Sequence, residues 1–208
     1  MRKYIAELLG TFALTLVVLL SLSSTSFPVV TPMLAALTLM LFVYSIGNIS
    51  GSHINPAVTI GLLAIGKTDF KDAFFYIISQ FLGAAAAIGL VGLLGIQMPI
   101  AGAAADSSVL VAEAFGTFFF TFGIASVALG RVHDAVSGLV VGGSLLMGIA
   151  IAASIGSAGI LNPAVAYGLQ SFSIPYVLGP ILGSVFGMLV YRLIDNAPSG
   201  EHRKENVK

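Results

Sequence analysis

Six long stretches of apolar residues, separated by short polar or Gly/Pro-containing breaks, dominate the pattern of this 208-residue chain. A helix that crosses a membrane needs about 20 apolar residues, because each residue adds about 1.5 Å to its length. All six stretches reach that length within boundary error, so the pattern predicts six transmembrane helices. Their expected bounds are 4–22, 33–49, 72–96, 108–130, 135–154 and 174–194.

Two further apolar segments, 55–65 and 162–171, are roughly half as long. Segments of that length are typical of re-entrant or buried elements rather than of membrane spans. Both begin with Asn-Pro-Ala-Val, and Asn is a preferred N-cap while Pro is tolerated in the first turn of a helix. The pattern therefore predicts two half-helices that begin within the membrane, and it favours a pore over a plain helical bundle. The residues of this repeated motif are Asn55, Pro56, Ala57, Asn162, Pro163 and Ala164.

Composition agrees with an integral membrane protein. Hydrophobic residues make up 57% of the chain, charged residues 9%, and the mean hydropathy is +1.02, whereas a soluble domain carries about 25% charged residues. The absence of cysteine excludes disulfides and thiolate metal sites. The net charge is zero, so nucleic acid is not expected as a partner.

The basic residues predict the orientation in the membrane. They precede the first span, follow the second, fourth and sixth spans, and are absent from the other three connections. Because Lys and Arg concentrate on the cytoplasmic side of membrane proteins, both termini are expected to be cytoplasmic. The short termini favour a prokaryotic inner membrane. The nine residues are Arg2, Lys3, Lys67, Lys71, Arg131, Arg192, Arg203, Lys204 and Lys208.

The chain also contains an internal repeat. The segment 6–12 (Ala-Glu-Leu-Leu-Gly-Thr-Phe) aligns with 112–118 (Ala-Glu-Ala-Phe-Gly-Thr-Phe), and the two Asn-Pro-Ala-Val motifs lie at nearly the same offset. This predicts a first repeat over 1–98, a second over 107–196 and a cytoplasmic tail over 197–208. Three spans in each repeat would make the repeats inverted relative to each other, with the N-termini of the half-helices meeting near the midplane.

Taken together, these motifs resemble the major intrinsic protein family, the aquaporins and glycerol facilitators. The resemblance is carried by 50–59, by the Ala-Glu-x-x-Gly-Thr-Phe segment of both repeats, by 80–84, and by Gly179 and Pro180 with Gly183. It covers nearly the whole chain except the tail. It implies an all-α membrane fold with six transmembrane helices and two re-entrant half-helices, a pore in each subunit, and a homotetramer embedded in lipid. It implies no cofactor and no metal.

Several residues are expected to line the pore. The N-termini of two half-helices place partial positive charge at its centre, which repels cations while neutral solutes pass. Asn55 and Asn162 can donate hydrogen bonds from their side-chain amides. Irregular backbone at membrane depth is tolerated where it lines a cavity or is packed in protein, so the stretches before each Asn are expected to present carbonyl acceptors. These come from Gly51, Ser52, His53, Ala158, Gly159 and Ile160.

Three ionisable residues in apolar segments each allow two interpretations. Glu7 and Glu113 could relay protons, or they could accept hydrogen bonds from the N–H groups of the re-entrant loops. Their matched positions in the two repeats favour the structural interpretation. His53 could gate with pH, or it could hold the first loop in place, which we favour. The three scattered His residues predict no metal site.

Small residues recur on the third and sixth spans, at positions that allow close helix packing. Spacing of this kind predicts helix crossings rather than chemistry. The residues are Gly83, Ala84–Ala87, Gly89 and Gly92 on the third span, and the glycines Gly179, Gly183 and Gly187 on the sixth.

The resemblance fails at the position that it implies for selectivity. Family members usually carry Arg three residues after the second Asn, where this chain has Val165. The other three filter positions, located by their offsets from the motifs, are Ala35, Ala150 and Gly159. Residues adjacent to Ala35 and Ala150 offer no aromatic, His or Arg either. A small and uncharged set predicts a wide, weakly selective filter.

The predicted function is a passive channel for small neutral solutes, namely glycerol, urea or undissociated metalloids such as arsenite, together with water. One alternative is a water-selective or non-conducting protein on the same fold. Another is an ion-coupled secondary transporter, for which the sequence offers no midplane charge besides the two Glu residues. An enzyme is not expected, because no nucleophile–base pair or metal cluster is evident.

Overall fold

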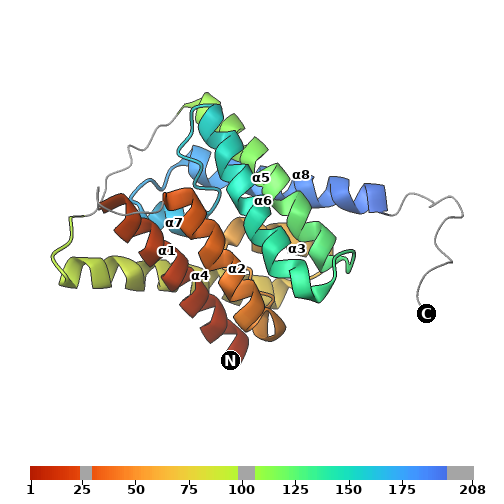
Figure 1. Cartoon of the computed structure of the whole chain (residues 1–208), viewed down its shortest axis with the longest axis horizontal. Coiled ribbons are helices and arrows are strands. Elements are labelled where there is room, and N and C mark those ends of the chain that lie inside the picture. The colour runs from red at the N-terminus through yellow and green to blue at the C-terminus, as the bar shows by residue number, and fades with distance from the viewer. Residues whose placement is uncertain (24–29, 98–105, 196–208) are drawn as a thin grey trace, which may run out of the picture.

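The computed structural model describes residues 1–23, 30–97 and 106–195, and these residues form eight α-helices (Figure 1). Six of them are long and apolar enough to cross a membrane, and two are short. The number and order of helices expected from the sequence are thus confirmed, while the tail at 197–208 lies outside the described residues. The helices are α1 (Arg2–Ser23), α2 (Thr31–Ser50), α3 (Pro56–Ala64), α4 (Phe70–Leu93), α5 (Ser107–Ala128), α6 (Asp134–Ser154), α7 (Pro163–Gly168) and α8 (Ile174–Asp195).

Local chemistry explains where the observed bounds differ from the expected ones. Helix α4 begins at Phe70 because Asp69 caps it, its Oδ1 accepting from the Asp72 N–H at 2.8 Å. The same helix ends at Leu93, and Gly95 follows with φ = +66°. Helix α7 ends at Gly168, about a turn earlier than expected, because Gln170 adopts a left-handed backbone with φ = +55°.

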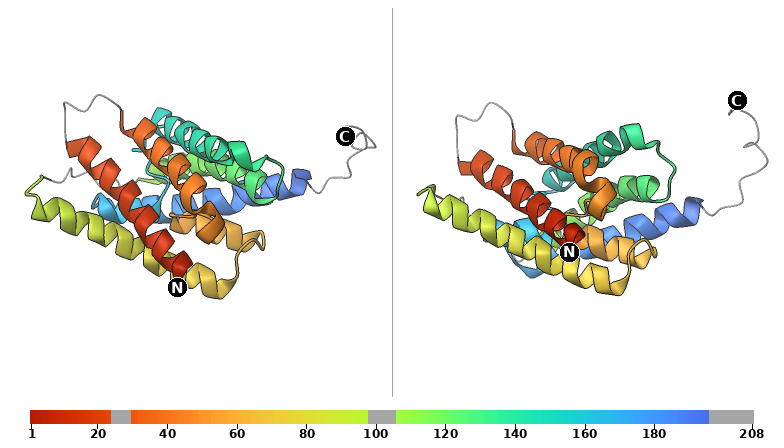
Figure 2. Two further views of the ribbon diagram at one scale, coloured as in Figure 1. Left: turned by 60° about the horizontal axis from the view of Figure 1, so that its bottom comes forward. Right: turned by 90° about the horizontal axis from the view of Figure 1, so that it is seen from below.

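The short helices interlock the two halves of the chain. Helices α1–α4 and α5–α8 each comprise three long helices and one short one. The short helix α3 packs against α8 and α5 of the other half, whereas α7 packs against α4 and α1 (Figure 1). Long helices pack against each other within a half, as α1 crosses α4 (Figure 2), and also between the halves, as α2 packs against α6. Each half therefore completes its core with an element of the other.

Glycines mark the closest helix crossings. A Cβ added to Gly83 on α4 would lie 2.3 Å from the Leu8 carbonyl oxygen on α1, and one on Gly183 of α8 would lie 2.1 Å from the Ala114 carbonyl oxygen on α5. Gly179 and Gly187 also lie against backbone carbonyls of α5, so four of the six crossings expected at glycines are confirmed.

Gly89 and Gly92 are the two exceptions. Nothing lies within 4 Å of a Cβ added to either residue, so the prediction that they mark crossings is wrong. Both residues are exposed and continue a stripe with Leu82 and Leu93 on the face of α4 that is turned away from the bundle. Composition identified small residues, but helical periodicity decides which of them meet a neighbour.

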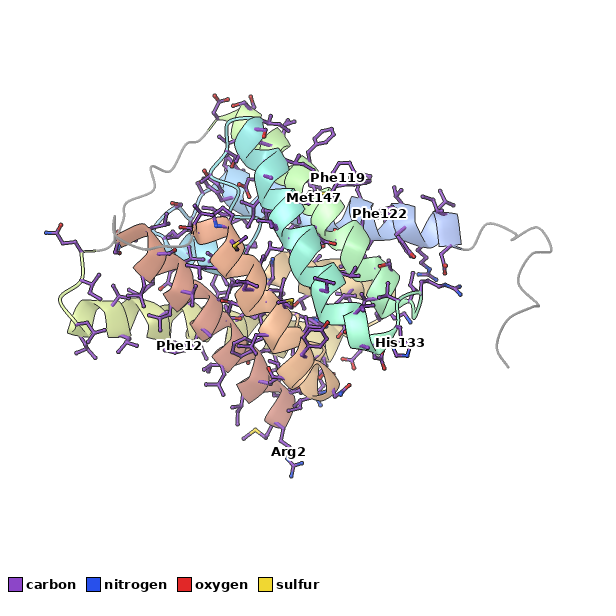
Figure 3. The ribbon with its side chains drawn as sticks, in the orientation of Figure 1. Arg2, Phe12, Phe119, Phe122, His133 and Met147 are labelled. Atoms are coloured by element: carbon purple, nitrogen blue, oxygen red, sulfur yellow. The ribbon has the colours of Figure 1, made fainter. Side chains whose placement is uncertain are left out.

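Charged side chains tie several connections of the bundle together. Lys3 forms an ion pair with Asp72, joining the starts of α1 and α4. Arg131 Nη2 donates to Asp195 Oδ2 at 2.8 Å, and Arg192 Nη1 donates to the Ile65 carbonyl at 3.1 Å. Arg2 and His133 both lie in the lower part of the view in Figure 3. The ion pair of Arg131 with Asp195 thus joins the α5–α6 connection to the end of α8.

Candidate pore and its lining

The two repeated Asn residues are the N-caps of the short helices. Asn55 Oδ1 accepts from the Ala57 N–H at 2.9 Å, at the start of α3. Asn162 Oδ1 accepts from the Ala164 N–H at 3.0 Å and the Val165 N–H at 3.3 Å, at the start of α7. Each cap is followed directly by Pro in the first turn, as the sequence pattern requires.

The same Asn side chains connect the two loops to each other. Asn55 Nδ2 donates to the Leu161 carbonyl at 2.9 Å, and Asn162 Nδ2 donates to the Ile54 carbonyl at 3.0 Å. The N-termini of α3 and α7 therefore meet. An amide nitrogen carries two hydrogens, so one N–H of each Asn remains available to a molecule beside it.

The carbonyls of Ile54 and Leu161 are oriented toward the Asn amides by a left-handed backbone at these two residues. Ile54 (φ = +37°) and Leu161 (φ = +54°) immediately precede the two Asn residues. Side-chain-bearing residues rarely adopt positive φ, which costs about 1–2 kcal/mol per residue. The same strain recurs at matched positions of both repeats, which indicates that the cross-loop bonds depend on it.

Two buried carboxylates hold the loops in this conformation. Glu7 on α1 accepts from the Ser50 hydroxyl (2.7 Å), the His53 N–H (2.9 Å), the Ile54 N–H (2.6 Å) and Gln80 Nε2 (2.8 Å). It is fully buried. These donors occupy both carboxylate oxygens, which is the geometry of a structural acceptor.

Glu113 on α5 repeats the arrangement for the second loop. It accepts from the Ser157 hydroxyl, from the Ile160 N–H at 3.0 Å and from the Leu161 N–H at 2.7 Å. Like Glu7 it is fully buried. The internal repeat thus extends to the hydrogen bonds that position each loop.

His53 lies between the first loop and its half-helix. Its Nδ1 lies 3.2 Å from Thr59 Oγ1 on α3, and its ring packs edge-on against Tyr76 at 4.9 Å between centroids. The side chain is buried. These contacts tie the loop to α3 and α4. Among the described residues, no group of three or more His, Cys, Asp and Glu could hold a metal ion.

Two cavities flank the Asn pair, and we name them after the orientation predicted from charge. The outer cavity has a volume of about 470 Å³, the inner cavity about 370 Å³. His53 lines both, so they approach each other at the level of the loops. Besides His53, seven expected site residues line the outer cavity: Ala35, Asn55, Ala158, Gly159, Ile160, Asn162 and Val165. Two more, Gly51 and Ser52, line the inner cavity.

The residue of α6 that lines the outer cavity is one position away from the expected one. Ala150 is exposed and lines neither cavity, whereas its neighbour Ile149 is buried and lines the outer cavity. One residue turns a helix by about 100°, so a slip of one position exchanges the outward and inward faces. Ile149 is larger than alanine but equally apolar and uncharged.

The loop carbonyls are available as acceptors. Within the described part of the chain, no donor bonds the carbonyl oxygens of the six expected residues, whereas the next carbonyls along, of Ile54 and Leu161, bond the Asn amides. All six residues line a cavity. They are Gly51, Ser52, His53, Ala158, Gly159 and Ile160.

Sequence reasoning missed several supporting residues. Gln80 Nε2 bonds both Glu7 and Thr59 Oγ1, and the Tyr76 hydroxyl donates to the Ser50 carbonyl at 2.7 Å. A buried polar residue in an apolar span was the available signal for Gln80. Phe120 and Leu145 also line the outer cavity, but they look like any other core residue in the sequence.

Comparisons with known proteins agree with this geometry. The family profile described as "Major intrinsic protein" matches residues 1–191. Aquaporin NIP1-1 of Arabidopsis thaliana is 32% identical over 219 residues, covering 93% of this chain and 74% of that protein. Aquaporin AqpM of Methanothermobacter marburgensis is 36% identical over 176 residues, covering 73% of this chain and 71% of its own length.

A solved structure shows the same fold. The X-ray structure of the aquaglyceroporin from Plasmodium falciparum superposes with a TM-score of 0.70 at 20% sequence identity. The match covers 94% of this chain and 96% of that one. At this identity the match shows the fold alone and gives no information about the solute.

Proposed function

The chain belongs to the major intrinsic protein family, and we propose that it passes neutral solutes larger than water through an uncharged outer filter. The proposed solutes are glycerol, urea or undissociated metalloids such as arsenite, with water passing as well. Membership of a family of membrane channels excludes an enzyme. The filter in this proposal consists of Ala35, Ile149, Gly159 and Val165.

The observation that carries the proposal is Val165 in the wall of the outer cavity. Val165 lies three residues after Asn162, is buried, and lines the cavity next to the Asn pair. An Arg there would add a charge and five hydrogen-bond donors, whereas Val adds neither. The cavity volume of about 470 Å³ falls within the usual range of small-molecule sites.

Neutral solutes fit the electrostatics better than ions do. The helix dipoles of α3 and α7 place partial positive charge at their N-termini, beside the Asn pair. A cation approaching the centre meets this field, while a solute with oxygen atoms meets amide donors and free carbonyls. The same features favour a channel over an ion-coupled transporter.

Two further parts of the proposal concern the setting. We place both termini on the cytoplasmic side of a prokaryotic inner membrane, because Lys and Arg occur before the first span and after the second, fourth and sixth spans and are absent from the other connections. We also propose a homotetramer with one pore in each subunit, as the family resemblance implies.

Flux through reconstituted vesicles tests the proposal. Stopped-flow light scattering should show faster shrinking or reswelling than in empty vesicles under gradients of water, glycerol and urea, and arsenite uptake should be measured directly. Val165→Arg should lower glycerol flux by about tenfold or more, because it adds bulk and charge to the filter. Val165→Met adds comparable length without charge and should retain more of the flux.

Two other flux results would contradict the proposal. Rapid water flux with glycerol, urea and arsenite at the level of empty vesicles would refute the wide filter. The apolar lining also favours one second candidate, a non-conducting protein, because hydrophobic constrictions can close a pore by excluding water. The absence of every flux would establish that alternative.

A further inference from the structure

The Tyr44 hydroxyl on α2 bridges two backbone groups in the first turns of α6. It donates to the Ala135 carbonyl at 3.0 Å and accepts from the Leu139 N–H at 3.2 Å. In a regular α-helix these two groups, four residues apart, bond to each other. A side chain that bonds to both therefore takes part in the backbone ladder of α6, at a point where inserted groups are known to bend helices.

The sequence of α6 makes room for this contact. A Cβ added to Gly138 would lie 2.5–2.7 Å from three atoms of the Tyr44 ring, so a larger residue would exclude the ring. Glycine within a helix is less favourable than alanine, and here it admits the ring. The cap of the same turn is His133, whose Nδ1 accepts from the Ala135 N–H at 3.2 Å. Histidine is not among the preferred N-cap residues, so Tyr44 supplements a weak cap.

The turn that Tyr44 bridges carries part of the wall of the inner cavity. Tyr44, Asp134 and Ser137 line this cavity, together with Lys67 from the α3–α4 connection. Asp134 and Lys67 are exposed, and neither side chain forms an ion pair with a described residue. Two opposite charges therefore lie on one cavity of about 370 Å³ without pairing.

The two charges are held by different parts of the fold. The Lys67 N–H donates to the Leu62 carbonyl at 2.8 Å, and Gly66 before it has φ = +72°. This is the Schellman arrangement that commonly ends a helix, and it fixes the backbone of Lys67 to the end of α3. The position of Asp134, in contrast, depends on the turn of α6 that Tyr44 bridges.

We propose that Tyr44 is a positioning residue of the channel, whose hydroxyl holds the start of α6 so that Asp134 does not pair with Lys67 across the inner cavity. This inference rests on the proposed function, since an ion pair there would obstruct the inner end of the same route. A hydrogen bond contributes about as much net stability as an exposed ion pair, or more. Loss of the hydroxyl is therefore enough to change which arrangement prevails.

The test measures water and glycerol permeability in reconstituted vesicles. Tyr44→Phe removes the hydroxyl and keeps the ring against Gly138. We expect it to lower both permeabilities by roughly two- to tenfold, the equilibrium effect of one hydrogen bond, and to leave their ratio unchanged, because an obstructed mouth stops both solutes. Tyr191→Phe is the matched control, since Tyr191 lies on α8 and lines neither cavity.

A second substitution separates positioning from stability. Asp134→Asn, added to Tyr44→Phe, removes the attraction to Lys67 at nearly constant size and should restore both permeabilities. A high salt concentration, which screens exposed charges, should restore them in part. Neither change would repair a channel that Tyr44→Phe had merely unfolded.

The outcomes distinguish this inference from the proposed function. If the parent passes glycerol, the role of Tyr44 alone is overturned by an unchanged permeability of Tyr44→Phe, by an equal decrease in Tyr191→Phe, or by a decrease that Asp134→Asn does not relieve. If the parent passes water but not glycerol, the wide filter fails, and water permeability tests Tyr44 in the same way. A parent that passes neither solute overturns both.

Discussion

Replacing Glu113 by Gln tests whether the buried carboxylate holds the second loop. The carboxylate accepts from the Ser157 hydroxyl and from the N–H groups of Ile160 (3.0 Å) and Leu161 (2.7 Å). Gln keeps the shape but retains one acceptor oxygen and introduces an NH₂ that faces a donor. At least one buried donor is then unsatisfied, which costs about 1–3 kcal/mol.

That cost is measurable by thermal unfolding. For a protein of this size, 1 kcal/mol lowers Tm by about 2–4 °C, so Glu113→Gln should lower Tm by about 2–12 °C. The chain contains no Trp, so the loss of helical circular dichroism in detergent is the appropriate signal. Glu7→Gln provides a matched variant in the other repeat, and its loss should be at least as large, because Glu7 also accepts from Gln80.

The alternative interpretation, a proton relay, makes the opposite prediction. A relay carboxylate could be neutralised with little effect on Tm but would abolish any transport driven by a proton gradient. An unchanged Tm for both Gln variants would therefore refute the structural role. A drop in Tm for both, with solute flux falling in parallel and no dependence on a proton gradient, is the result that we expect.

Two further predictions concern packing and capping. Gly183→Ala should strongly destabilise the fold, because its Cβ would lie 2.1 Å from a backbone carbonyl oxygen. Gly89→Ala should be neutral or stabilising by about 0.5–1 kcal/mol, because its Cβ would meet nothing within 4 Å. Equal melting temperatures of the two variants would contradict this reasoning. The backbone N–H of Ser108 lowers the pKa of Asp106, the cap of α5. The stabilisation that the Asp106 carboxylate gives the fold should therefore be fully present above its unfolded-state pKa and disappear as pH falls through its folded-state pKa. Asp106→Asn should flatten this acid dependence of Tm.

The sequence predicts the backbone of the pore well because its signals are local. Asn before Pro defines the start of a helix wherever it occurs, and the pair at Asn55 and Asn162 indeed caps α3 and α7. The six spans follow from length and hydropathy alone. The inverted relation of the repeats, which counting three spans in each predicts, stays a prediction.

Side-chain direction is what the sequence could not supply. Counting back from Asn162 reached a helix that lines the outer cavity but the wrong face of it, giving Ala150 where Ile149 lines the cavity. Gly89 and Gly92 failed for the same reason, since their helix turns them away from α1. The direction in which a helical side chain points depends on tertiary packing, and a span that is apolar on all sides has no sequence pattern that reveals this direction.

The repeat also indicates which groups beside the Asn pair would exclude cations in the proposed channel. Val58 and Val165 occupy equivalent positions, three residues after each Asn, and Val58 lines the inner cavity as Val165 lines the outer one. Neither side of the Asn pair therefore has a charge next to it, and Lys67 and Asp134 contribute charges of opposite sign to the inner cavity lining. In the proposed channel, the groups that would oppose a cation are then the dipoles of α3 and α7 and the two Asn amides, which come from both repeats.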